Sequence, residues 1–268
     1  MDVRDLHEQN RRGWNQGAEA YEADERARLE FLRSGGTNFC PPEFAYLEGL
    51  SEWCGRAVHL QCASGQDTLS LWNLGAREVV GVDISDRMVE SGRRTAEALS
   101  APATFYRCDV LDTPHELDGT ADLVYTGRGA LCWIMDIVAW AKVPARLLKP
   151  RGRLYIFEGH PYMNVWQLEP SSYVFDPVYG DYFNEKPISD AGWPTTYIGD
   201  LGMQAAQHEV KHERQWRIDQ IVNACLDAGL VLTKMGEHPE PYWNQFPNIP
   251  AEELRRLPQT ISLLFTKP

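Results

Sequence analysis

Apolar runs of strand length alternate with helix-like stretches through the middle of the chain. Residues 57–60 form the first run, residues 66–74 carry leucines at helical spacing, and residues 79–82 form the second run. A helix over residues 86–99 and a strand over residues 105–110 continue the alternation. Because each predicted strand reaches the next through a helix, the strands are expected to lie parallel in βαβ units.

The same alternation extends towards the C-terminus. Helices are predicted up to Leu148 and over residues 218–228, and strands over residues 121–126, 153–158, 231–238 and 260–267. Strands that alternate with helices are typical of an α/β fold, in which a doubly wound, mostly parallel sheet carries helices on both faces.

Two segments do not follow this rhythm. Residues 1–50 are predicted to be helical and peripheral to the sheet, with one helix over residues 43–50. Residues 159–216 are too long and too rich in aromatic residues to be a simple connection. We divide the chain into residues 1–50 and 51–268, with an insertion at about 159–216 that packs over the mouth of the sheet. Its aromatic rings either contact a flat or cationic small molecule or form a small core of their own.

Composition and charge restrict the function. The 268 residues carry a net charge of −12 and no long basic stretch, which disfavours a nucleic-acid partner. No run of eighteen apolar residues predicts a membrane span, and the charged N-terminus lacks the core of an export signal. The six cysteines form no C-x-x-C pair and fit free thiols, so we expect a cytoplasmic protein.

The turn after the first predicted strand carries the clearest chemistry. The small residues at 63–65 let the backbone approach a ligand closely, and Asp83 ends the next strand, where it can accept hydrogen bonds from ribose hydroxyls. A dinucleotide fingerprint would have glycines in place of Gln61, Ala63 and Gln66. Asp67 in the first helical turn disfavours a pyrophosphate but tolerates a sulfonium zwitterion.

Residues 60–65, Leu-Gln-Cys-Ala-Ser-Gly, resemble motif I of the class I, Rossmann-like S-adenosylmethionine (SAM) methyltransferases, which often reads L-G-C-G-T-G. Residues 124–133 and 157–161 are similar to a bacterial small-molecule subgroup of that family. The resemblance implies a seven-stranded sheet of order 3-2-1-4-5-7-6 with an antiparallel last strand. It also implies SAM as the cofactor and methyl transfer to an oxygen or nitrogen atom of a small molecule.

The resemblance assigns roles to residues around the loop. Asp83 would bind the ribose, Asp109 and Val110 the adenine, and Arg128 the amino-acid end of SAM. Trp14 and Tyr21 would belong to an N-terminal helical lid, or else only anchor their helix to the core. The full set of expected cofactor-binding residues is Trp14, Tyr21, Gln61, Ala63, Gly65, Gln66, Asp83, Ile84, Met88, Asp109, Val110, Thr126, Gly127 and Arg128.

Glu158 and His160 are the candidate catalytic bases, because they end the fifth predicted strand and enter the insertion. The proline after His160 favours an extended backbone that could aim the imidazole at the pocket, although His160 could also simply bind a loop carbonyl. His208 and His212, with Glu209 and Glu213 beside them, would share a face if they lay on a helix. Their segment could equally be a strand, and we predict no metal.

Three other functions compete with methyl transfer to a small molecule. A nicotinamide-dependent oxidoreductase would explain the βαβ unit, but the loop lacks its glycine fingerprint. A SAM-binding sensor or assembly partner without catalytic activity would fit the altered motif I. A tRNA or protein methyltransferase is the third, and the acidic composition argues against RNA.

Overall fold

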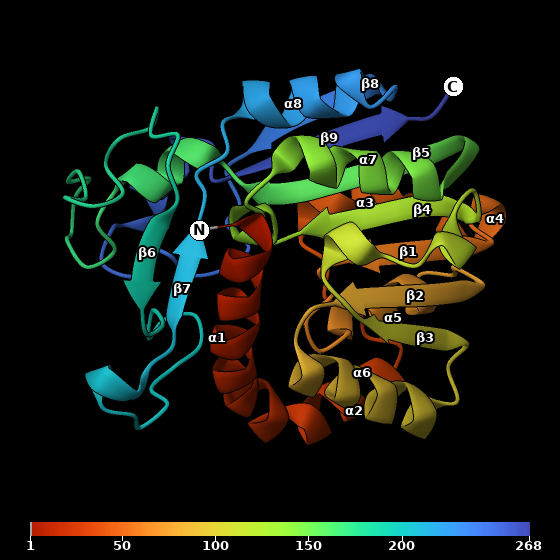
Figure 1. Ribbon diagram of the computed structural model, residues 1–268, viewed down its shortest axis with the longest axis horizontal. Coiled ribbons are helices and arrows are strands. Elements are labelled where there is room, and N and C mark those ends of the chain that lie inside the picture. Colours follow the sequence, from red (N-terminus) through yellow and green to blue (C-terminus); the bar gives the residue numbers. More distant parts are fainter. Residues whose placement is uncertain (1) are drawn as a thin grey trace.

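A seven-stranded sheet runs through the centre of the molecule (Figure 1). The computed structural model describes residues 2–268, with the backbone alone for Ala205. The strands of the sheet are β1 (Arg56–Leu60), β2 (Glu78–Asp83), β3 (Ala103–Arg107), β4 (Ala121–Gly127), β5 (Leu148–Gly159), β8 (Val231–His238) and β9 (Thr260–Thr266). Their order is β3-β2-β1-β4-β5-β9-β8, and β9 runs antiparallel to both neighbours. The expected α/β sheet, with its seventh strand between the fifth and sixth, is therefore confirmed.

Helices cover both faces of the sheet because its central strands are apolar on both sides. The crossover helices are α5 (Gln66–Asn73), α6 (Asp86–Leu99), α7 (Ile137–Leu147) and α8 (Ile218–Asp227). On one face Val124 and Leu154 belong to the same core as Trp140 of α7 and Ile221 of α8. Successive side chains of a strand point to opposite faces of the sheet. The other face therefore carries large rings, such as those of Tyr125, Tyr155 and Phe157, which pack under the N-terminal segment.

Four helices precede the sheet: α1 (Val3–Ala23), α2 (Glu25–Arg33), α3 (Pro41–Leu47) and α4 (Leu50–Trp53). Helix α1 packs between α6 and strand β7 (Val210–Glu213) (Figure 1). This close packing needs small residues, since a Cβ atom on Gly13 would lie only 2.6 Å from Cγ of Lys211. The single helix expected over residues 43–50 is divided into α3 and α4, because Gly49 between them has a positive φ of 66°.

The insertion carries a second, two-stranded sheet of β6 (Ile188–Ala191) and β7, which pair antiparallel. His212 thus lies on a strand rather than a helix, and its ring nitrogens contact Ser189 and Gln9. The short helices of the chain are η1 (Val110–Asp112), η2 (His115–Leu117), η3 (Leu131–Trp133), η4 (Pro161–Val165), η5 (Ala205–Gln207) and α9 (Ala251–Leu254). Met163, Phe246 and Ile249 form a small separate core with Trp166 and Tyr173, so some aromatic residues of the insertion pack on one another and on the loop after β8.

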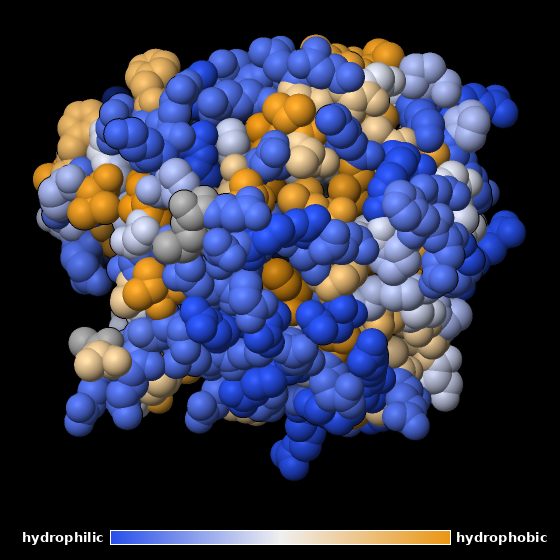
Figure 2. Space-filling model, in the orientation of Figure 1, coloured by the Kyte–Doolittle hydropathy of each residue, from blue (hydrophilic) through white to orange (hydrophobic). Residues whose placement is uncertain are grey.

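The surface seen in Figure 2 is mostly hydrophilic, with hydrophobic side chains exposed in a few places. Figure 2 shows hydrophilic side chains over most of one face, with hydrophobic side chains over the insertion at the left and over α7 and α8 at the top. The exposed large apolar residues of the insertion include Val174, Phe175, Val178 and Phe183. Within residues 2–268, no helix is both long enough and apolar enough to cross a membrane.

Candidate active site

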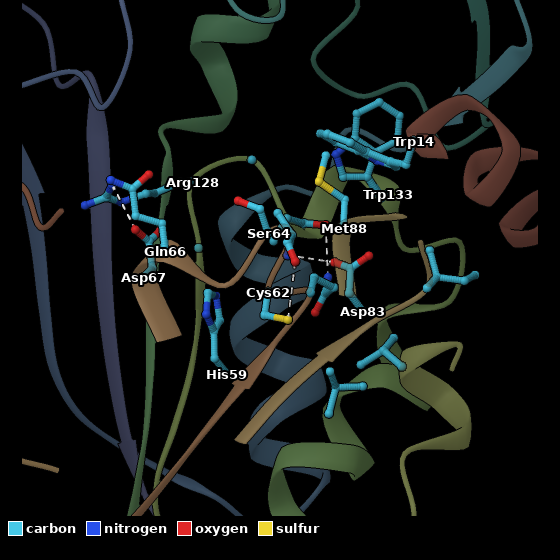
Figure 3. A pocket seen from close by; sticks show the side chains of 18 of the residues that line it. Trp14, His59, Cys62, Ser64, Gln66, Asp67, Asp83, Met88, Arg128 and Trp133 are labelled. Carbon is cyan, nitrogen blue, oxygen red and sulfur yellow. Dashed lines mark hydrogen bonds and ion pairs between the residues drawn. The ribbon is translucent and has the colours of Figure 1, made fainter. Parts of the chain in front are cut away.

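A cavity of about 270 Å³ opens at the carboxyl ends of β1, β2 and β4 (Figure 3). The order of the sheet reverses between β1 and β4, and open α/β sheets place their ligand crevice at such a point. Figure 3 shows Trp14, Trp133 and Met88 gathered on one side of the cavity and the Arg128–Asp67 pair on the other.

The loop between β1 and α5 keeps the backbone conformation of a glycine-rich loop without most of the glycines. Gln61, Ala63 and Gly65 all have positive φ angles, of 55°, 45° and 79°. These are the three positions at which L-G-C-G-T-G has glycine. Gly65 also has no room for a side chain, because its Cβ atom would lie 2.6 Å from the ring of Phe105. Only this last glycine of the motif remains in the sequence.

The side chain of Gln61 replaces the first glycine with a set of hydrogen bonds. Its Nε2 donates to the carbonyl of Ala130 over 3.0 Å, and its Oε1 accepts from Nε1 of Trp140 over 3.2 Å. The hydroxyl of Thr126 also donates to Oε1, over 3.4 Å. Gln61 therefore ties the loop to the segments that follow β4.

Asp83 holds the other side of the same loop. Its carboxylate accepts the backbone N–H of Ala63 and of Ser85, each over 2.8 Å. Burial raises the pKa of Asp83 to about 6, against the opposing effect of these N–H donors. Each carboxylate oxygen can accept two hydrogen bonds, so acceptor capacity remains towards the cavity that Asp83 lines.

Asp109 follows β3, which ends at Arg107 rather than at residue 110 as expected, because Asp109 caps η1 through the N–H of Leu111. Its Oδ2 lies 2.7 Å from Nδ1 of His7 and 2.8 Å from the guanidinium of Arg4. His7 Nε2 accepts the N–H of Met135, so its Nδ1 carries the proton donated to Asp109. Burial acts to raise the pKa of Asp109, but the His7 and Arg4 contacts hold it below its ordinary value.

Arg128 belongs to a buried ion cluster. Its Nη2 donates to Glu43 over 2.6 Å, and its Nη1 lies 3.6 Å from Oδ1 of Asp67. The same Asp67 oxygen accepts from Nδ2 of Asn38 over 2.7 Å. Burial raises the pKa of Glu43, and the charge of Arg128 opposes that rise. The guanidinium is thus already paired within the protein, although Arg128 also lines the cavity.

Most of the expected cofactor-binding residues meet at the cavity. Those that line it are Trp14, Tyr21, Gln61, Ala63, Gln66, Asp83, Ile84, Met88, Asp109, Val110, Gly127 and Arg128. Gly65 and Thr126 lie behind this lining: Gly65 packs on Phe105, and Thr126 is fully buried. Ser64, Asp67 and Cys62, which flank the expected positions in the loop, line the cavity as well.

Sequence reasoning named Trp14 and Tyr21 on the first helix but missed the stripe that they form with His7 and Asn10. His7, Asn10, Trp14 and Tyr21 all line the cavity, and they are spaced three, four and seven residues apart along α1. This spacing places them on one helix face, so it was a usable signal. Trp133, Tyr197 and Tyr242 were also missed, and they come from three separate segments that only the tertiary fold brings together.

The two candidate bases have different surroundings. Glu158 accepts three backbone N–H groups, from Gly129 over 2.6 Å and from Ala130 and Leu131 over 2.9 Å each. Burial raises the pKa of Glu158 to about 6. His160 is buried, lies 3.1 Å from Glu237, and is in the lining of neither the first cavity nor the second one beside it. Its position therefore gives no support to a role as base.

A second cavity, of about 260 Å³, adjoins the first. Gly129, Trp133, Tyr197 and Tyr242 line both cavities and form the wall between them. Glu158 lines the second cavity together with aromatic residues of the insertion, including Tyr179 and Trp193. In the described part of the chain, no group of three or more His, Cys, Asp or Glu side chains is placed to hold a metal ion.

Comparison with known proteins shows similarity to methyltransferases over part of the chain. Residues 57–152 match a family model described as a methyltransferase domain. No curated protein matches the sequence. The chain is similar in structure to an S-adenosylmethionine-dependent methyltransferase from Mesorhizobium loti, with 20% identity, a TM-score of 0.55 and coverage of 84% of this chain and 96% of that one.

Two further solved structures show the range of proteins with this fold. One is geranyl diphosphate C-methyltransferase from Streptomyces coelicolor A3(2), with 18% identity, a TM-score of 0.56 and coverage of 85% of this chain and 78% of that one. The other is the cyclase SpnF, with 17% identity, a TM-score of 0.55 and coverage of 84% and 80%. At such identities the likeness is one of fold. The family match over residues 57–152 and this likeness together show a segment similar to a methyltransferase domain within the seven-stranded fold of SAM-dependent methyltransferases.

Proposed function

We propose that the protein transfers a methyl group from SAM to a nitrogen or oxygen atom of a small molecule bound in the second cavity. The observation that carries the proposal is the shared wall: a nucleotide-type cavity at the sheet edge adjoins an aromatic cavity across Gly129, Trp133, Tyr197 and Tyr242. SAM supplies an electrophilic methyl group on a sulfonium. Methyl transfer then depends mainly on holding the acceptor atom in line with that group, since orientation alone can contribute several kcal/mol, up to about 7–11.

The cofactor side of the proposal uses the residues of the loop and the strand ends. Asp83 has free acceptor capacity for the two ribose hydroxyls. Met88 and Val110 offer apolar contacts for the adenine, with Asp109 beside them. The uncharged small residue Ala63 and the paired acid Asp67 suit a cationic sulfonium better than a pyrophosphate.

Helix α1 is proposed to act as a lid over the cofactor. The Trp14 ring lies 5.3 Å from that of Trp133 and 4.6 Å from that of Trp193, so α1 is joined to both the η3 segment and the insertion. Residues 2–50 would then cover the cofactor and residues 159–216 the acceptor. Closing both cavities excludes water from the transfer.

A small-molecule acceptor also agrees with the size and charge of the protein. The second cavity, about 260 Å³, suits a compact ligand rather than a chain end of a macromolecule. The net charge of −12 argues against nucleic acid. The six cysteines are free thiols, as expected in the cytoplasm, the location that we propose.

Thermal unfolding with SAM, S-adenosylhomocysteine and NAD separates this proposal from a nicotinamide-dependent oxidoreductase. We expect both sulfur compounds to raise the melting temperature and NAD to leave it unchanged. Stabilisation by NAD alone would contradict the proposal. Binding of SAM without transfer of a labelled methyl group to any amine, phenol or alcohol would favour the alternative of a SAM-binding protein without methyl transfer, which the altered motif I also fits.

A further inference from the structure

The second cavity combines aromatic rings with an excess of carboxylates. Its acidic residues are Glu158, Asp176, Asp190 and Glu213, and its basic residues are Lys211 and Arg214. Rings and carboxylates together are the surroundings that favour a cationic ligand.

Three of the four carboxylates are held by backbone N–H groups. Glu158 accepts from three of them, Asp176 from Val178 and Tyr179, and Asp190 from Ala191. The carboxylate of Glu213 differs, because no other residue between 2 and 268 gives it a hydrogen bond or an ion pair. Glu213 thus faces the cavity with its full acceptor capacity.

The two basic groups are turned to the protein instead of the cavity. Nζ of Lys211 donates to the carbonyl of Gly192 and lies 4.5 Å from the centre of the Trp193 ring. The guanidinium of Arg214 donates to the carbonyl of Asn184 over 3.2 Å and lies 4.3 Å from the Trp216 ring centre. Both groups therefore donate to backbone carbonyls, and the carboxylate of Glu213 keeps its acceptors free for an incoming cation.

Glu213 also lies close to the wall between the cavities. It is the last residue of β7, and the next residue, Arg214, donates its N–H to the carbonyl of Cys132 over 2.8 Å. This bond fixes the end of β7 beside Trp133, a residue of the wall. The charge of Glu213 reaches Tyr242, another residue of the wall, where it helps to raise the pKa of the phenol after the larger effects of burial, Glu158 and Cys132.

We propose that the acceptor is an amine that enters the second cavity as an ammonium ion, and that the carboxylate of Glu213 binds this ion and takes its proton. The inference rests on the proposed methyl transfer and names its substrate class. The proton passes from nitrogen to Glu213, and the freed lone pair forms the bond to the methyl carbon. The carbon–sulfur bond breaks, its electron pair stays on sulfur, and a neutral thioether and a methylated ammonium remain.

The electrostatics of Glu213 agree with this role. Burial raises its pKa to about 7, Lys211 opposes the rise, and Asp190 adds to it. A carboxyl that titrates near neutral pH is well matched to proton transfer. The other groups that face it are Cys132 and the phenols of Tyr179 and Tyr242; burial raises the pKa of all three, so they are neutral at pH 7.

The test uses two probes of equal shape, choline and its uncharged carbon analogue 3,3-dimethylbutan-1-ol. Each is titrated calorimetrically into the full-length protein saturated with S-adenosylhomocysteine. We expect choline to bind roughly tenfold more tightly, or better, because the cation meets a free carboxylate and aromatic faces. Glu213→Gln should remove most of this preference. Glu209→Gln removes the same charge on the outer surface, where it pairs with Arg12, and should keep the preference.

Equal affinity of the two probes for the wild-type protein, or no binding of either, would overturn the proposal, and so would an unchanged preference in Glu213→Gln. Binding of S-adenosylhomocysteine is measured first, so its absence would instead point to failure of the proposed function.

A screen with radiolabelled SAM supplies a second readout, in which amines, and not phenols or alcohols, should carry the label. With a labelled amine, kcat/KM of the wild type should rise with pH through about 7. Glu213→Gln should lose that rise, whereas a residue with only a structural role would leave the profile unchanged.

Discussion

The loop after β1 allows one substitution to be predicted in sign as well as size. Ala63 and Gln61 both occupy the left-handed region, at φ of 45° and 55°. This conformation costs a residue with a Cβ atom about 1–2 kcal/mol. Glycine avoids that cost, but it loses more conformational entropy on folding than alanine does, which destabilises the folded state by about 0.5–1 kcal/mol. Ala63→Gly should therefore stabilise the folded protein by about 0.5–1 kcal/mol, the difference between these two effects.

Gln61→Gly relieves the same strain and should nevertheless have the opposite sign. It removes the hydrogen bonds to Ala130 and Trp140 and leaves Nε1 of Trp140, a fully buried residue, without its acceptor. An unsatisfied buried donor lowers the free energy of unfolding by about 1–3 kcal/mol, which exceeds the stabilisation gained from relief of the backbone strain. We expect a net destabilisation of about 1–2 kcal/mol.

Urea unfolding followed by circular dichroism measures both variants against the wild type. A change of 1 kcal/mol also corresponds to about 2–4 °C in melting temperature for a chain of this size. Two variants at neighbouring positions with the same backbone conformation act as controls for each other. Destabilisation by Ala63→Gly, or stabilisation by Gln61→Gly, would show that the left-handed backbone is not strained or that the Gln61 bonds contribute little.

Three further predictions concern the cavity and its surroundings. Asp83→Ala should weaken SAM binding more than tenfold, since a charge-assisted hydrogen bond contributes roughly 1.5–3 kcal/mol. Calorimetric titration measures the affinity for SAM, and Asp227→Ala, at an exposed position, should leave that affinity unchanged. His7→Leu should destabilise the fold by about 1–3 kcal/mol, because Met135 N–H and Asp109 lose a buried partner, whereas His115→Leu on the surface should change unfolding by less than about 0.5 kcal/mol. Glu213→Gln should flatten the pH dependence of the free energy of unfolding between pH 4.5 and about 7. The raised pKa of Glu213 favours its protonated form in the folded protein, so the wild type loses stability as pH rises through that window. An equally steep loss in the variant would show that Glu213 is not its origin.

The sequence was sufficient to predict the sheet because its central strands are buried on both faces. Runs such as residues 79–82 and 154–157 are apolar and continuous, and the loops between them carry clear turn residues. The order of the last two strands came from the family resemblance, since no local pattern fixes where a strand enters a sheet. Residues 43–50 were less readable, because Gly49 divides what looked like one helix.

The site was predictable where one loop makes it and not where distant segments meet. Asp83, Asp109 and the residues around Ala63 follow strands directly, so their meeting point could be inferred from topology. The pairing of Asp109 with His7 spans 102 positions in the chain, and Tyr197 and Tyr242 reach the wall from irregular segments. Periodicity carries no information on such contacts. Glu213 was named only beside the histidines, because its exposure to a cavity is a property of β7 and η3 together.

The crystal structure of the complex with S-adenosylhomocysteine tests the central claim most directly. The account predicts the ribose hydroxyls within hydrogen-bond distance of Asp83 and the sulfur directed at the wall formed by Trp133, Tyr197 and Tyr242. A ribose bound away from Asp83, or a sulfur turned away from the second cavity, would contradict methyl transfer between the two cavities.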